Sequence, residues 1–278
     1  MNPLHVRIGH IKFTNALPIC HFLDKSDPEI EFIPGAPSDL NRWLAEGTVD
    51  AGLCSSLAYA ELADDFVALR GLSVSARGPV GSIFFFSKRP WEELNGAVIA
   101  LPTISKSSSN LLKILLAETG IAPAEYVTLP SDDLHAMLDQ ADAALLIADD
   151  ALYWSVQEHG CYLYDLGEEW NKRTGHSMTF AVCAVPKRLI EENPEKVRKI
   201  HRFFLEGKQK GLADMDAVIA QAKRMLGQTE EFWRAYFNKL RHDLDEEWAV
   251  GANAYFDAAY RHGLLKKPVK LELWGDEE

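Results

Sequence analysis

The stretch VIALPTISKSSSNLLKILLAETG, residues 98–120, joins an apolar run to a helical pattern through a turn that is rich in hydroxyl groups. VIALP has the composition of a buried strand, and LLKILL has the apolar spacing of a helix. The first N–H groups of a helix lack partners within the helix and carry partial positive charge. Together with the hydroxyls of Thr103, Ser107 and Ser108, they predict an anion site. Serine is also a common helix cap, so capping is the alternative interpretation.

A second turn of the same kind lies upstream in the chain. Residues 48–53 (TVDAGL) predict a short strand that leads into Ser55 and Ser56, and the helical pattern LAYAELADD follows. Two such turns suit a ligand with two carboxylates or phosphates, although capping again is the alternative. The sequence contains neither G-x-x-x-x-G-K-[ST] nor G-x-G-x-x-G, which makes a nucleotide a poor candidate for this ligand.

Composition and charge restrict the class of protein. A chain of 278 residues with 47% apolar and 25% charged residues can bury a full core in one large domain or two lobes. The net charge of −12 argues against nucleic acid and anionic membranes as partners. The start MNPLHVRIGHIKF is too polar for a signal peptide, so we expect a cytoplasmic protein. The four cysteines form no C-x-x-C pair, and we expect buried thiols and no metal.

The order of strand and helix signals predicts the architecture. These signals alternate along most of the chain and favour an α/β fold with mostly parallel sheets, whereas the last third is helical. Two apolar strands, 82–87 (SIFFFS) and 178–185 (MTFAVCAV), bracket a central segment with its own alternation. We therefore expect one lobe from residues 1–85 and 186–278, an inserted lobe from 88–180, and hinges at the two bracketing strands. Ligands bind beyond the carboxyl ends of strands, so the two serine turns would face each other across a cleft.

Several spaced motifs together resemble chorismate dehydratase, the enzyme that opens the futalosine route to menaquinone. The motifs are RIGHIKFTNALPI (7–19), LNRWLAEGTVDAGLCSSLAYAEL (40–62), GPVGSIFFFS (78–87), IALPTISKSSSNLLKILL (99–116), ALLIADDAL (144–152) and YDLGEEWNKRTG (164–175). They cover about the first two thirds of the chain. The resemblance implies the two-lobed fold of type II periplasmic solute-binding proteins. It also implies that the protein converts chorismate to 3-[(1-carboxyvinyl)oxy]benzoate with loss of water, without a cofactor or metal.

The same resemblance implies roles for individual residues. Asn15 and Ser82 fall at the positions expected to be catalytic, where Asn15 would donate to developing charge and Ser82 would orient a carboxylate or relay a proton. A helix cap and a strand-end hydroxyl are the alternatives for these two residues. The serine turns would hold the two carboxylates of chorismate. Asp149 is a candidate for substrate binding or for the base, with N-capping as its alternative, and the enolpyruvyl carboxylate of the substrate is another candidate base.

The chain departs from the dehydratase pattern at a few positions, and two other functions remain open. Ala148 stands where glycine is common, residues 176–178 replace Leu, Pro and Phe, and Cys183 stands where Trp is more usual. The related 1,4-dihydroxy-6-naphthoate synthase is similar in fold and places a catalytic histidine in the segment corresponding to LLIADD. Because Ala148 stands at or beside that place, this activity is disfavoured. A non-catalytic intracellular binding protein or sensor for a small dicarboxylate is the other alternative, because one fold can serve sensing and catalysis.

Overall fold

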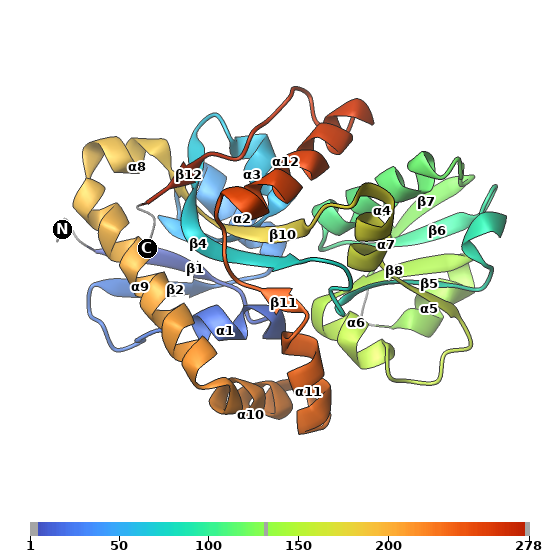
Figure 1. Ribbon diagram of the computed structural model, residues 1–278, viewed down its shortest axis with the longest axis horizontal. Coiled ribbons are helices and arrows are strands. Elements are labelled where there is room, and N and C mark those ends of the chain that lie inside the picture. The colour runs from blue at the N-terminus through green and yellow to red at the C-terminus, as the bar shows by residue number, and fades with distance from the viewer. Residues whose placement is uncertain (1–4, 131–132, 276–278) are drawn as a thin grey trace.

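Two β-sheets lie side by side in the computed structural model, which describes residues 5–130 and 133–275 of the chain (Figure 1). The larger sheet has the strand order β11-β4-β10-β3-β1-β2, with β12 paired to β4, and the smaller has the order β7-β6-β8-β5-β9. The strands of the larger sheet are β1 (Val6–His10), β2 (Ile30–Pro34), β3 (Ala51–Ser55), β4 (Phe66–Ala76), β10 (Met178–Pro186), β11 (Leu240–Arg241) and β12 (Leu273–Trp274). Those of the smaller sheet are β5 (Ile83–Ser87), β6 (Val98–Pro102), β7 (Glu125–Leu129), β8 (Ala143–Ile147) and β9 (Tyr162–Asp165).

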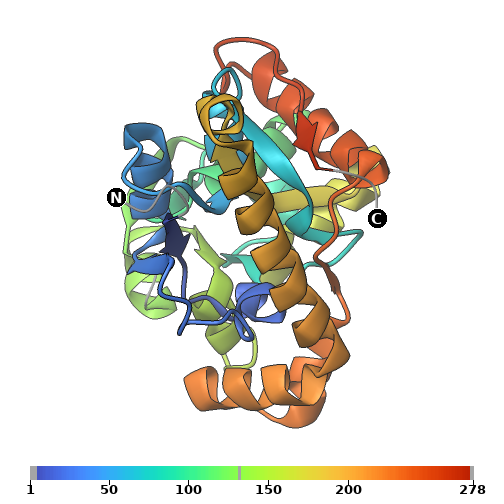
Figure 2. The ribbon, with the colours of Figure 1, turned by 90° about the vertical axis from the view of Figure 1, so that its left-hand side faces the viewer.

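Helices separate most of these strands and cover both sheets (Figures 1 and 2). They are α1 (Leu17–Cys20), α2 (Pro37–Glu46), α3 (Ser56–Leu62), α4 (Lys106–Glu118), α5 (Leu134–Gln140), α6 (Ala148–Trp154), α7 (Leu166–Thr174), α8 (Lys187–Glu192), α9 (Pro194–Ala213), α10 (Met215–Leu226), α11 (Glu230–Phe237) and α12 (Glu246–Arg261), with the 3₁₀ turns η1 (Thr14–Ala16) and η2 (Trp91–Glu93). This alternation is the α/β pattern that the sequence predicts.

Local sequence explains the central elements. All five residues of β8 are buried, as expected for an apolar run between two neighbouring strands. Helix α4 buries Leu111, Leu112 and Leu115, whose spacing places them on one face. Each sheet is therefore held to its helices by the hydrophobic effect, the largest favourable term in folding.

The expectation of mostly parallel sheets is wrong. Of the ten strand pairings between described strands, five are parallel and five are antiparallel. Strand β5 runs antiparallel to both of its neighbours, and so does β10. These two strands receive the chain as it passes from one sheet to the other, and a strand inserted in this way need not follow the direction that helical crossovers impose on the others.

The connections between the sheets are short. The chain leaves the larger sheet at the end of β4, crosses through residues 77–82 and enters β5. It returns after α7 through residues 175–177 into β10. Of the expected hinges 82–87 and 178–185, residues 83–87 and 178–185 belong to β5 and β10, each paired within one sheet, and the crossing backbone precedes both strands. Ser82 is the last residue of the first crossing segment.

The C-terminal third surrounds the larger sheet. Helix α9 crosses one face of this sheet, where Val197, Ile200 and Phe204 pack in a cluster that includes Ile8 and Leu72 of the sheet side (Figure 2). These are the apolar positions whose helical spacing predicts burial. The end of α11 and strand β11 then bring the chain back to β4.

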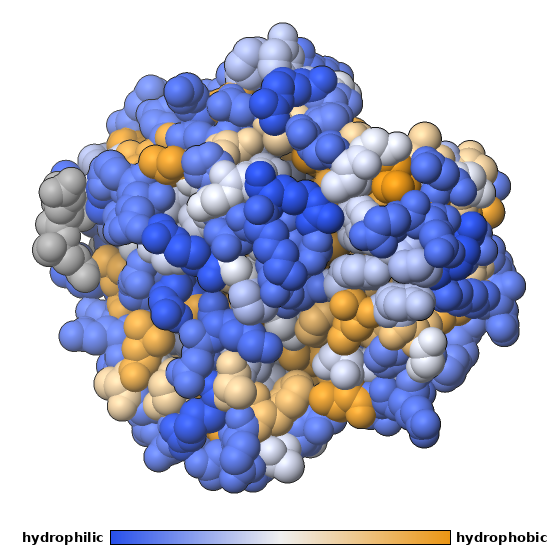
Figure 3. Space-filling view, turned by 45° about the vertical axis from the view of Figure 1, so that its right-hand side comes forward, coloured by the Kyte–Doolittle hydropathy of each residue, from blue (hydrophilic) through white to orange (hydrophobic). Residues whose placement is uncertain are grey.

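The face in Figure 3 is mostly hydrophilic, with apolar residues in small groups. No helix within residues 5–130 and 133–275 is both long and apolar enough to span a bilayer.

Candidate active site between the two sheets

A pocket lies between the two sheets and takes its lining from both. Its polar lining residues are Asn15, Asn41, Ser55, Ser82, Ser105, Lys106 and Ser108. Its apolar wall includes Phe13, Leu53, Val74, Ile147 and Phe180. Four of the eight predicted site residues, Asn15, Ser55, Ser82 and Ser108, therefore meet at one place. A larger surface hollow lies along α9, but none of the predicted residues lines it.

The two serine turns converge on this pocket, and each is also a helix cap. The Oγ atom of Ser55 accepts a hydrogen bond from the backbone N–H of Ala58 at 3.4 Å, at the start of α3. The Oγ atom of Ser105 accepts from the N–H of Ser108 at 3.3 Å, at the start of α4. Capping uses a serine hydroxyl as an acceptor, so its proton is left to donate elsewhere. The capping and anion-binding interpretations are therefore compatible.

Three other predicted residues point elsewhere. Ser107 Oγ accepts from the N–H of Leu57 at 3.0 Å, and its carbonyl accepts from the Tyr255 hydroxyl at 3.0 Å. Ser56 is fully buried and donates to the carbonyl of Thr179. Thr103 is exposed and is not among the lining residues. Ser107 thus joins α4 to α3 and α12, and Ser56 joins α3 to β10.

The sequence reasoning missed two pocket residues, Ser105 and Asn41. Ser105 precedes the first residue of α4, so the preference of serine for the N-cap position was a usable signal. Asn41 lies in α2, and its Oδ1 atom is buried with no hydrogen-bond partner among the described residues. Nothing in its local sequence distinguishes it from an ordinary polar helix residue.

The backbone around Asn15 is held by two contacts, one made by its own carbonyl and one by the preceding residue. Its carbonyl accepts from Nε2 of His242 at 2.9 Å. The preceding residue, Thr14, donates from its N–H at 3.2 Å and from its Oγ1 at 2.6 Å to Oδ1 of Asp149. Burial lowers the pKa of His242 to about 4, so the ring is neutral near pH 7. Because a carbonyl can only accept, Nε2 carries the ring proton.

Ser82 lies on an equally constrained segment. Its carbonyl accepts from the N–H of Ala148 at 2.7 Å. The two preceding N–H groups, of Val80 and Gly81, donate to the carboxylate of Asp165 at 3.0 and 2.6 Å. Asp165 also accepts the N–H groups of Gly167 and Glu168 at the start of α7. Burial raises the pKa of Asp165, and these four donors oppose the increase.

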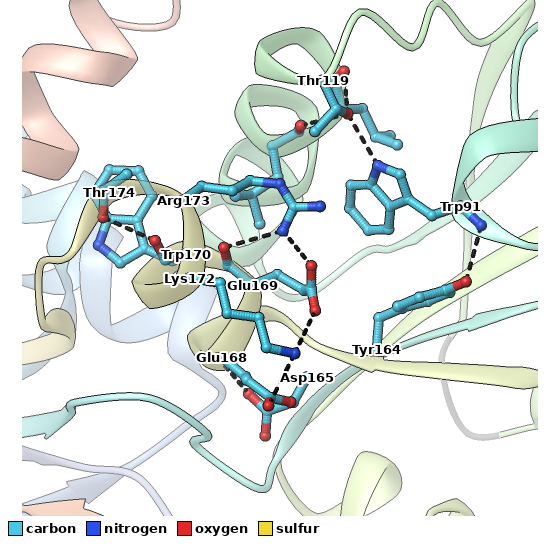
Figure 4. Close-up of polar contacts among 12 residues, drawn as sticks. Trp91, Thr119, Tyr164, Asp165, Glu168, Glu169, Trp170, Lys172, Arg173 and Thr174 are labelled. Carbon is cyan, nitrogen blue, oxygen red and sulfur yellow. Dashed lines mark hydrogen bonds and ion pairs between the residues drawn. The ribbon is translucent and has the colours of Figure 1, made fainter.

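A network of charged and aromatic side chains stiffens the corner that holds Asp165 (Figure 4). Glu169 forms an ion pair with Arg173, whose guanidinium lies 4.9 Å from the centre of the Trp91 ring. The Trp91 Nε1–H donates to Thr119 at 2.9 Å, and its backbone N–H donates to the Tyr164 hydroxyl at 2.8 Å. The network links α7, β9 and α4, so the segment before Ser82 is anchored to the core of the smaller sheet.

Asp149 and Ala148 lie where β8 turns into α6. Asp149 is not among the lining residues, and its carboxylate is occupied by Thr14. Burial raises its pKa, the hydrogen bonds from Thr14 oppose this, and the charge of Asp150 adds to it. Ala148 lines the pocket with a φ of +50°. Glycine, which is common at this position in the resembled family, adopts that conformation without strain.

The other departures from the dehydratase pattern lie outside the pocket. Cys183 is fully buried in β10, and the carbonyl of Ser177 accepts from Nε1 of Trp170. His176 lines a separate hollow between α4, α7 and α12. These substitutions therefore change the support of the sheets rather than the lining. Within the described ranges, no group of three or more His, Cys, Asp and Glu residues is placed to hold a metal ion.

Comparisons with known proteins place this site in a family. The sequence profile of a family described as menaquinone biosynthesis matches residues 6–261. The chain is 30% identical to the chorismate dehydratase of Thermus thermophilus over 266 residues, which are 90% of this chain and 94% of the relative. It is 28% identical to the 1,4-dihydroxy-6-naphthoate synthase of the same organism over 233 residues, which are 81% of each chain.

The fold is that of a periplasmic binding protein. The structure of the periplasmic aliphatic sulphonate binding protein of Escherichia coli superposes with a TM-score of 0.70 at 18% identity, covering 100% of this chain and 96% of the other. The expected α/β, two-lobed, periplasmic-binding-protein-like fold is thereby confirmed. With the profile spanning nearly the whole described chain and the dehydratase relative covering nine tenths of it, this chain belongs to the menaquinone biosynthesis family.

Proposed function

We propose that the protein is a chorismate dehydratase that forms 3-[(1-carboxyvinyl)oxy]benzoate and water. The observation that carries this proposal is the meeting of Asn15 and Ser82 with three serines of two helix starts in one pocket. The similarity to the Thermus thermophilus chorismate dehydratase over nine tenths of the chain supports it.

The chemistry of the reaction fits these residue types. The proton on C3 of chorismate is acidified through the conjugated ring carboxylate, and loss of the C4 hydroxyl leaves an aromatic ring. The protein must therefore orient a dianion and stabilise negative charge that develops on the ring carboxylate. Hydroxyl groups of Ser55, Ser105 and Ser108, beside the starts of α3 and α4, would donate to the carboxylates. Asn15 and Ser82 would donate nearer the bonds that break.

The group that removes the proton from C3 of chorismate is the remaining role to assign. No Asp, Glu or His is among the described residues that line the pocket. Asp149 is close in sequence to Ala148, but its carboxylate accepts two hydrogen bonds from Thr14. We therefore assign proton removal to the enolpyruvyl carboxylate of the substrate itself. The enzyme would hold that carboxylate against C3, and orientation alone can supply a large part of a rate enhancement.

The alternatives differ in what the pocket must contain. For a 1,4-dihydroxy-6-naphthoate synthase, the segment at β8 would have to supply a histidine, and Ala148 cannot abstract a proton. A dicarboxylate sensor would use the same anion-binding groups without turnover. A turnover assay is therefore needed to distinguish a dehydratase from a sensor, whereas the absence of a histidine at Ala148 already disfavours the synthase.

The experiment is to incubate the purified protein with chorismate and to follow the ultraviolet spectrum for aromatisation. Turnover that is lowered at least a hundredfold in Asn15→Ala, with chorismate affinity changed less than fivefold, is the expected result. Thr103→Ala serves as the control, because Thr103 is exposed and does not line the pocket. Tight binding of chorismate without turnover would instead identify a sensor, and unchanged turnover in Asn15→Ala would remove this residue from the catalytic group.

A further inference from the structure

Tyr236, near the end of α11, lies directly behind the segment that carries Ser82. A Cβ atom placed on Gly81 would lie 3.2 Å from Cδ2 of the Tyr236 ring, so the ring packs against the backbone next to Ser82. The residue is almost fully buried. Burial raises the pKa of this phenol well above its usual value, the nearby Ser82 side chain opposes the increase, and the charges of Asp149 and Asp165 add to it.

The hydroxyl of Tyr236 is unusual among buried groups of the protein. It has no hydrogen-bond partner of normal geometry among the described residues, a state it shares with only two other buried side-chain atoms in that part of the chain. One of these is Oδ1 of Asn41, which lies at the same pocket. Buried hydroxyls are rarely left unpaired because the loss of hydration is unfavourable. The Ser82 side chain, which lies close enough to lower the pKa of this phenol, is the group that would pair it.

We propose that Tyr236 is a positioning residue for Ser82, donating its phenolic proton to Ser82 Oγ so that the Ser82 proton is directed into the pocket. A serine hydroxyl has one donor and two acceptor positions. When Ser82 Oγ accepts a hydrogen bond from the Tyr236 phenol on the side away from the pocket, the Ser82 hydroxyl proton can point into the pocket. A phenol is protonated throughout the physiological pH range, and the raised pKa of Tyr236 keeps it a donor well above that range. This positioning role depends on the dehydratase assignment in one respect only, the identity of the substrate that Ser82 would contact.

The test is a double-mutant cycle with Tyr236→Phe and Ser82→Ala. Tyr236→Phe removes the hydroxyl and keeps the ring on Gly81. We expect kcat with chorismate to fall about tenfold or more while KM changes less than twofold. In the presence of Ser82→Ala, the same substitution should have no further effect on kcat, because the group that it positions is gone.

Tyr59→Phe is the matched control. Tyr59 is also fully buried, but its hydroxyl contacts the backbone of Glu272, and neither residue lines the pocket. Its kcat should stay within twofold of wild type, although both substitutions should lower Tm by a few degrees, as loss of one hydrogen bond does in a chain of this size.

The same cycle measured by thermal unfolding without substrate separates the two proposals. If the hydroxyls pair, the Tm shift caused by Tyr236→Phe should largely vanish in the presence of Ser82→Ala. If the wild-type protein does not turn over chorismate, the dehydratase assignment is wrong. The unfolding experiment would still test whether Tyr236 pairs with Ser82. Additive Tm shifts would overturn the pairing. Normal kcat in Tyr236→Phe, with an active wild type, would overturn the positioning role.

Discussion

Asn41 is the pocket residue whose side chain is least satisfied by its protein neighbours. Its Oδ1 atom is buried without a partner among the described residues, which costs about 1–3 kcal/mol for a polar group. We expect Asn41→Leu, which removes that group at similar volume, to raise the free energy of unfolding by about 1 kcal/mol. If Asn41 contacts substrate, kcat/KM for chorismate should fall roughly tenfold in the same variant, since one hydrogen bond is worth about that factor. Urea unfolding and steady-state kinetics measure the two effects, and a stabilised variant with unchanged kcat/KM would exclude Asn41 from the site.

Single residues also show which parts of the site were predictable. Ser55 and Ser108 follow from local rules, because a serine between a strand and a helix belongs at a helix start and thus at the sheet edge. Ser107 obeys the same rule, yet its hydroxyl is taken by the N–H of Leu57. Which hydroxyl of a cluster faces a pocket depends on the rotation of the helix, and this is set by packing partners distant in sequence.

Among the secondary-structure elements, strand β4 shows what could not be predicted from local sequence. It is the longest strand, yet the sequence reasoning passed over its residues, FVALRGLSVSA. Arg70 and Gly71 interrupt the apolar pattern, and Gly71 has a φ of +76°. The register with β10 shifts at the same place, from Val182 opposite Ser73 to Ala184 opposite Ala68. An irregularity of this kind bends a strand without ending it, so a local break in the pattern was not a true boundary.

The support of the η1 turn by His242 gives a prediction at this scale. The pKa of His242 is lowered from 6.5 to about 4 by burial, so protons bind the unfolded chain more strongly in this interval. Its contribution to stability is present above pH 6.5 and is lost as the pH falls toward 4, by about 3 kcal/mol in total. When the pH is lowered from 7 to 5, we expect the free energy of unfolding to fall by about 2 kcal/mol more for wild type than for His242→Gln.

Urea unfolding at the two pH values measures this difference. His10 also has a pKa lowered to about 4 by burial, but it titrates in both proteins and cancels in the comparison. Equal pH dependence of the two proteins would show that His242 is not held neutral against the carbonyl of Asn15.

At the scale of the whole molecule, the site depends on segments that are far apart in the chain. Alternating strands and helices were enough to predict an α/β fold, because that pattern is local and repeats. The His242–Asn15 contact joins residues 227 positions apart, and the Thr14–Asp149 contact joins residues 135 apart. Such pairs leave no local signal, so the role of the C-terminal third in supporting the pocket could not be inferred from its helical pattern.

The Thr14–Asp149 contact also connects an element beside the larger sheet to one beside the smaller sheet, and Asp149 is therefore either a bridge or a base. Burial raises its pKa, so the charged carboxylate is disfavoured in the folded state and the associated stability is lost as the pH rises through the folded pKa. Asp149→Asn keeps an acceptor for Thr14 and removes the charge. If Asp149 is a bridge, Asp149→Asn should retain kcat within about threefold, because its amide oxygen can accept both bonds from Thr14. Relative to wild type, this variant should be more stable at pH 7 than at acidic pH, because the buried charge is absent.

Asp149→Leu provides the contrast, because leucine cannot accept from Thr14. The loss of the bridge should raise KM for chorismate severalfold and increase the radius of gyration measured by small-angle X-ray scattering, since the two lobes lose a connection beside the pocket. A carboxylate that acts as the base would behave differently, because neither Asn nor Leu can take a proton from C3. Both variants would then lose turnover to the same extent, and the assignment of proton removal to the substrate carboxylate would be wrong.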